Sequence, residues 1–235
     1  MAVETPRMSQ GLPVWARVLL AVAVVTLFIL GLWLVGGVVT DNFDVAMALT
    51  AFWFAGFGAL ALGVASRRPD LRLAVGGTFL VTAAVVGGFL AWSTLRDKTV
   101  DEKVVTGRAA SGTETEAAAG EAPPSGNVTL AGGKFRGIAH ETVGRAAVVK
   151  LESGERKLTL TGFETDAGPD LFVYLVAGGN PEDTESHKSL GSLKGNKGNQ
   201  QYTIPAGVDL GRYDTVVIWC RAFSVAFGAA ELGAV

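Results

Sequence analysis

Hydrophobic and polar positions divide this chain into two different parts. Three long apolar runs, at residues 18–39, 45–65 and 73–92, fill most of the first hundred positions, and none contains Asp, Glu, Lys, Arg or His. A helix rises about 1.5 Å per residue, so about twenty residues cross a hydrocarbon core of about 30 Å. The pattern therefore predicts three transmembrane helices in contact with membrane lipid.

The charges between these runs indicate their orientation. The connector at residues 67–72 carries three arginines, whereas the connector at 40–44 is acidic. Short cationic loops stay in the cytoplasm. We therefore expect a multi-pass protein of the cell membrane, with residues 1–17 cytoplasmic and everything after residue 92 outside. A cleaved signal peptide is the rival interpretation of the first run, but the run is too long for one and no small-residue cleavage site follows it.

The polar pattern changes twice more along the chain. Residues 93–127 are rich in Ala, Gly, Glu, Thr and Ser, which is typical of a flexible linker, here extracytoplasmic. Residues 128–235 contain short apolar runs separated by turn residues, with no helical period between them. The clearest runs are 146–151, 157–161, 171–176, 201–204 and 215–220. This spacing predicts an all-β, antiparallel, sandwich-like or barrel domain.

Composition then excludes several classes of function. The formal net charge is -2, so nothing indicates nucleic acid as a partner. One cysteine excludes an internal disulfide, and the apolar runs have no histidine to ligate haem. The glycine-rich stretch 191–198 lacks the ending of a phosphate loop, and we interpret it as a hairpin or a long β-loop. No Ser/His/Asp set or carboxylate pair indicates a classical enzyme.

The chain's one cysteine is its main chemical candidate. Strand alternation places Cys220 on the same face as Val216 and Ile218, and Trp219 on the opposite face. Burial among aliphatic side chains would raise the pKa of the thiol and make it inert, whereas Arg221 would lower that pKa if it turned toward the sulfur. The sequence leaves open a packing role and a redox or ligand role.

Several stretches of the β region together match a known family. They are residues 133–135 with His140 downstream, 168–175, 190–205 and 216–220, followed by Phe223, Phe227, Ala230 and Leu232. The segment 133–232 resembles the DM13 domain family (also written DM-13), which is proposed to take part in electron transfer. The resemblance implies a β-sandwich-like fold and a functional cysteine, Cys220, acting as a bare thiol or as a ligand of a prosthetic group. Relatives are often fused to DOMON and membrane cytochrome domains, but these helices lack haem ligands, so a redox partner would be a separate molecule.

Histidines extend the candidate site. His140, His187 and Cys220 are the ligand types of a blue-copper centre. The spacing does not fit copper, because neither histidine nor methionine follows Cys220 and the β region has no methionine, so we expect no metal site. His187 lies in a polar loop where we expect a solvated side chain. Cys220 with His140 as a thiol–imidazole pair or a haem pair stays open, and the cofactor stays unknown.

These observations leave three functional hypotheses. The first is a membrane-anchored extracytoplasmic domain with a redox or electron-transfer role through Cys220, assisted by His140, and with an unidentified redox partner. The alternative is a non-catalytic binding or interaction module of the cell envelope. The third is an assembly joined by an intermolecular disulfide. Exposure of Cys220 and its position relative to His140 distinguish them.

Overall fold

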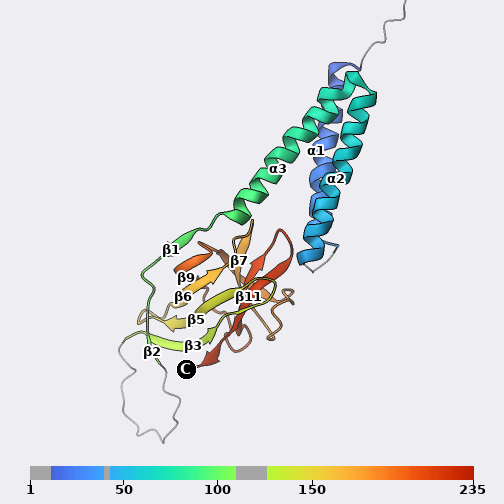
Figure 1. Cartoon of the computed structure of the whole chain (residues 1–235). Helices are drawn as coiled ribbons and strands as arrows, with labels where there is room; N and C mark the ends of the chain where they lie inside the picture. Colours follow the sequence, from blue (N-terminus) through green and yellow to red (C-terminus); the bar gives the residue numbers. More distant parts are fainter. Residues whose placement is uncertain (1–11, 40–42, 110–125) are drawn as a thin grey trace, which may run out of the picture. The chain divides into compact units, whose positions relative to one another are not determined.

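The computed structural model describes residues 12–39, 43–109 and 126–235, and its described chain divides near residue 90 into two compact units. Figure 1 shows a helical N-terminal unit and a C-terminal unit built from strands. The predicted acidic connector at 40–44 lies partly outside the described residues.

The N-terminal unit confirms the three predicted helices. They are α1 (Val14–Gly37), α2 (Phe43–Arg67) and α3 (Thr78–Leu95), the last preceded by the 3₁₀ turn η1 (Pro69–Leu71) and the π-helical segment η2 (Arg72–Gly77). The spans long and apolar enough to cross a membrane are Val14–Gly36, Val45–Arg67 and Pro69–Leu95. They indicate a multi-pass membrane protein whose helices contact lipid.

An aromatic cluster fills the interior of the helical unit. Phe28 has no exposed surface, and its ring lies 4.9 Å from that of Phe54 and 5.6 Å from that of Phe79. The indole N–H of Trp53 donates to the backbone oxygen of Phe28 at 3.1 Å. Edge-to-face ring packing of this kind holds helices together where no hydrophobic effect drives them. The described contacts therefore suit an anchor.

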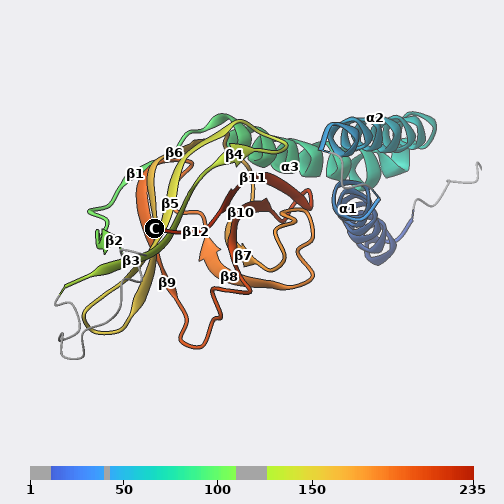
Figure 2. The same cartoon turned by 90° about the horizontal axis from the view of Figure 1, so that it is seen from below.

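The C-terminal unit consists of two sheets that face each other (Figure 2). The first has the order β1-β9-β6-β5-β3-β12, with β2 beside β3, and the second has the order β4-β11-β10-β7-β8. The strands of the first sheet are β1 (Thr99–Asp101), β2 (Arg108–Ala109), β3 (Val128–Lys134), β5 (Thr142–Lys150), β6 (Arg156–Thr165), β9 (Lys197–Ile204) and β12 (Gly233–Ala234). Those of the second are β4 (Arg136–Gly137), β7 (Leu171–Val176), β8 (His187–Ser192), β10 (Thr215–Cys220) and β11 (Val225–Glu231).

This architecture confirms the predicted sandwich-like β domain. The second sheet is antiparallel throughout, and the first is antiparallel except where β1 joins β9 and β2 joins β3. The strands β7 and β10 have the bounds that their apolar runs predict. They are central in their sheet and buried on both faces, which explains why their sequences are almost continuously apolar.

The range predicted as a flexible linker contains two of these strands. β1 pairs in parallel with β9, and the backbone N–H of Lys98 donates to the Asn196 side chain at 2.7 Å. The Asn199 amide donates to Asp101 at 3.0 Å. These partners lie about a hundred positions downstream, so pairing with β9 orders a segment whose own composition favours disorder. The remainder of the predicted linker, residues 110–125, lies outside the described residues.

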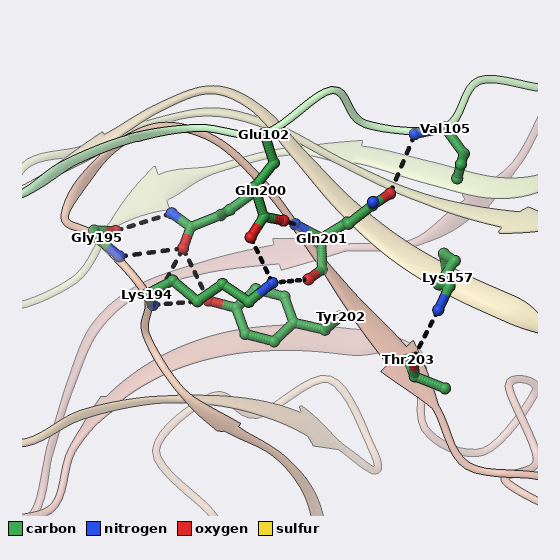
Figure 3. A network of polar contacts seen from close by, with 9 residues as sticks. All are labelled: Glu102, Val105, Lys157, Lys194, Gly195, Gln200, Gln201, Tyr202 and Thr203. Atoms are coloured by element: carbon green, nitrogen blue, oxygen red, sulfur yellow. Dashed lines mark hydrogen bonds and ion pairs between the residues drawn. The ribbon is translucent and has the colours of Figure 1, made fainter.

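A buried polar network fixes the crossover from β8 to β9 (Figure 3). Gln200 has no exposed surface, and its side-chain oxygen accepts from the backbone N–H groups of Lys194 and Gly195, at 3.2 and 3.3 Å, and from the Tyr202 hydroxyl at 2.8 Å. Its amide donates to the Gly195 carbonyl at 2.8 Å. Burial raises the pKa of Tyr202 to about 12, so the hydroxyl keeps its proton. The glycine-rich stretch 191–198 is thus the end of β8, a short loop at residues 193–196 that carries the chain from one sheet to the other, and the start of β9.

Candidate functional site

Cys220 is the last residue of β10, in the middle of the second sheet. It pairs with Leu171 on β7 and with Val225 on β11, and no part of it is exposed. Val217 and Trp219 pack into a cluster with Tyr174, whereas Cys220 alternates to the other face of the strand. The structure therefore places the thiol among buried side chains and strands.

Burial governs the protonation of this thiol. Loss of solvent raises the pKa of Cys220 to about 11, against the opposing effect of the backbone N–H groups of Phe223, Ala222 and Asp170 near the sulfur. The thiol is therefore protonated at neutral pH and is a poor nucleophile. The same three N–H groups would stabilise negative charge on the sulfur if the proton left.

The side chain of the neighbouring Arg221 contacts Asp170 and Phe172. The side chain of Arg221 donates from Nε to Asp170 at 3.0 Å, and its guanidinium lies 3.9 Å from the centre of the Phe172 ring. Its backbone N–H also donates to the Asp170 carbonyl at 3.0 Å. The possibility that Arg221 turns toward the sulfur is thus not realised, and the pKa of Cys220 stays above its ordinary value.

The turn that follows Cys220 has a strained residue. Ser224 has a φ of 49°, in the left-handed region, and among the described residues it is the one non-glycine position there. Residues 221–224 form this turn between β10 and β11, and two of its backbone N–H groups face the thiol. Strain of this kind persists where the surroundings hold it, here at the element that covers the sulfur.

His140 lies beside β11, on the side away from β10. It follows β4, its Nδ1 lies 2.9 Å from a carboxylate oxygen of Asp166, and its ring lies 3.8 Å from that of Phe227. Its backbone N–H donates to the Phe227 carbonyl, so β11 lies between this segment and the strand of Cys220. A role for His140 together with Cys220 stays a prediction.

His187 differs from its expected environment. It begins β8 and is half-buried, with its ring stacked on Tyr174 at 4.1 Å and Nδ1 2.6 Å from the carbonyl of Thr184. The expectation of a solvated loop side chain was wrong, because the strand pairing of β8 with β7 carries His187 onto the ring of Tyr174. In the described part of the chain, no group of three or more His, Cys, Asp and Glu side chains is arranged to hold a metal ion.

The surroundings of Cys220 also show whether its sulfur could be an axial ligand of haem. An axial ligand needs a sulfur that faces open space, whereas Cys220 is fully buried and its partners Leu171 and Val225 are buried as well. A haem would enter only if the strands separated. The residues around Cys220 therefore do not fit haem in this conformation.

Comparison with known families identifies the C-terminal part. Residues 134–232 match the family described as Electron transfer DM13. This segment is a DM13 domain. No curated protein and no solved structure matches the chain. The match confirms the resemblance predicted from the sequence, and the DM13 domain extends from the end of β3 to just beyond β11, with three long apolar helices N-terminal to it.

The DM13 domain also carries a group of aromatic residues that sequence reasoning missed. Phe172 and Tyr174 lie on one face of β7, and Trp219 lies opposite Phe172 on β10. With His187 from β8 they form the aromatic row of the second sheet. Alternation alone puts Phe172 and Tyr174 on one face, but which strand brings a tryptophan beside them depends on a register that the sequence does not reveal.

Proposed function

We propose that this protein is a membrane-anchored electron-transfer accessory whose DM13 domain works outside the cytoplasm, with Cys220 as its redox group. The observation that supports it most directly is the match of residues 134–232 to the DM13 family. The one cysteine of this segment ends a central strand, and three backbone N–H groups lie near its sulfur. These groups partly offset the burial that raises the pKa of the thiol, and they would stabilise a negative charge on the sulfur if its proton left. Burial, for its part, opposes thiol exchange by direct collision with a solution partner.

A one-electron oxidant tests this role. In the purified full chain in detergent micelles, ferricyanide is expected to be reduced in a phase that Cys220→Ser lacks. In that phase the thiol gives one electron to the iron and its proton to solvent, which leaves a thiyl radical on Cys220. Cys220→Ser keeps nearly the same side-chain volume, and an unchanged unfolding transition would show that its fold is intact. Equal reduction by both proteins would contradict the redox role of Cys220.

Full burial favours a second candidate function, a non-catalytic binding or interaction module of the cell envelope. A thiol with a pKa near 11 and no exposed surface behaves like a small apolar side chain. Under this alternative, Cys220→Ser leaves both ferricyanide reduction and partner capture unchanged. The same burial opposes an intermolecular disulfide through Cys220. A dimer on non-reducing electrophoresis that Cys220→Ser lacks would support that third hypothesis instead.

The sidedness of the DM13 domain is part of the proposal. It is supported by the arginine-rich connector at residues 67–72, where Arg68 also pairs with Asp70 at 3.3 Å. A reporter enzyme that folds only outside the cytoplasm is expected to be active when fused after Val235, and inactive when fused after Arg68. The reverse pattern of activity would overturn this orientation.

A further inference from the structure

The aromatic row of the second sheet brings together oxidisable side chains. The Trp219 and Tyr174 rings are nearly parallel, with an interplanar angle of 21° and centres 6.5 Å apart, and Phe172 lies 6.2 Å from Tyr174. His187 stacks on Tyr174 at 4.1 Å, with an interplanar angle of 22°. Indole and phenol are side chains that can lose one electron without a metal. The row is thus a chain of rings in near contact.

Exposure differs along the row. Trp219 is half-buried and reaches solvent, whereas only 5% of Tyr174 is exposed. The other four tryptophans of the chain lie in or beside the apolar helices, at Trp15, Trp33, Trp53 and Trp92. A soluble oxidant that approaches the DM13 domain therefore has one tryptophan to contact, and that tryptophan lies beside a tyrosine that the oxidant hardly reaches.

We propose that Trp219 and Tyr174 form an electron relay, in which Trp219 is the contact for a one-electron acceptor and Tyr174 supplies the electron from beneath the surface. This inference rests on the proposed electron-transfer function and gives it a route that does not pass through Cys220. The acceptor gains one electron and Trp219 becomes a radical cation. Tyr174 then gives one electron to Trp219 and its phenolic proton to water, which leaves a neutral tyrosyl radical. A one-electron reductant such as ascorbate returns Tyr174 to the phenol.

The surroundings of Tyr174 suit this role. Burial raises the pKa of its phenol, against the effect of the Arg221 cation, so the ring is neutral at rest. Arg221 is itself paired with Asp170 at 3.0 Å, which offsets a positive charge that would otherwise oppose loss of an electron. The Nδ1–H of His187 donates to a carbonyl, which fixes the imidazole flat against the Tyr174 ring. The relay is thus held by strand register and by charge pairing.

Photo-oxidation of the full chain in detergent micelles tests the relay. The probe is a soluble ruthenium polypyridyl complex with a sacrificial quencher, and peptide mass spectrometry locates the oxidised side chains. Oxidation is expected at Tyr174 in spite of its burial, and Trp219→Phe is expected to lower it several-fold. Tyr213 is the internal control, because it is 9% exposed and has cations, Lys188 and Arg212, each 5.4 Å from its ring instead of a tryptophan.

A second variant keeps the test decisive if Trp219→Phe disturbs packing. Trp219→Tyr retains an oxidisable ring and is expected to restore oxidation of Tyr174, whereas Trp219→Phe does not. Oxidation of Tyr174 that is equal in wild type and Trp219→Phe would overturn the relay, and so would its absence while Tyr213 is oxidised. Cys220→Ser is expected to leave this pattern unchanged, so failure of the relay and failure of the Cys220 role give different results.

Discussion

Cys220 is expected to react with iodoacetamide on the order of a hundredfold more slowly in the folded protein than in the unfolded chain at neutral pH. Its pKa is raised from 9.0 to about 11, and each pKa unit lowers the thiolate fraction about tenfold. Lack of exposure slows the reaction further. The rate is measured by mass spectrometry of the full chain in micelles, with the same chain in denaturant as the reference.

The pH dependence of this labelling separates protonation from access. The folded thiol has a pKa of about 11, so it is mostly protonated at any pH below that value. Its labelling rate is therefore expected to keep rising with pH beyond 9, where the rate of an unperturbed thiol levels off. A folded-state rate equal to that of the unfolded chain, or one that levels off near pH 9, would show that the sulfur is exposed and unperturbed.

Gln200→Leu is expected to lower the free energy of unfolding of the DM13 domain by about 3 to 5 kcal/mol. Leucine has a similar volume, but it removes the acceptor of the Gly195 N–H and of the Tyr202 hydroxyl, and also the donor to the Gly195 carbonyl. A buried polar group left without its partner costs about 1 to 3 kcal/mol. Denaturant unfolding of the full chain in micelles, followed by the β-sheet signal, measures the change.

The adjacent Gln201→Leu is the matched control. Its side chain is half-buried, and the side-chain oxygen Oε1 accepts one hydrogen bond, from the backbone N–H of Val105 at 3.1 Å (Figure 3). Water can replace that bond, so the expected loss is about 1 kcal/mol. If the two variants lost equal stability, the buried network around Gln200 would not be what fixes the crossover loop.

The local pattern of apolar residues was sufficient to predict the elements that consist of long apolar runs. The three helices and the strands β7 and β10 follow from long apolar runs, and the alternation of Val216, Ile218 and Cys220 placed the thiol on its face. By contrast β1 has three residues, and its partner Lys197 lies about a hundred positions away, so nothing in its own composition indicates a strand. The polar sequence of β8 likewise concealed a strand at the edge of the second sheet.

The sequence pointed to Cys220 as the candidate residue, and its functional role stays a prediction, but the environment of the thiol could not be predicted. One cysteine in a recognisable family segment led to Cys220. The pairing of Arg221 with Asp170 and the stack of His187 on Tyr174 arise from contacts across strands, which one sequence does not specify. The aromatic row was missed for the same reason, because its members come from three strands.

The strand β1 shows that the folded β domain extends beyond the family segment. The family segment begins at residue 134, yet β1, β2 and most of β3 precede it and belong to the same sheet. β1 covers the outer edge of β9, and an uncovered edge strand invites pairing between molecules. The family segment is thus smaller than the folded domain to which it belongs, and a fusion that joined a new anchor at residue 134 would leave the outer edge of β9 uncovered.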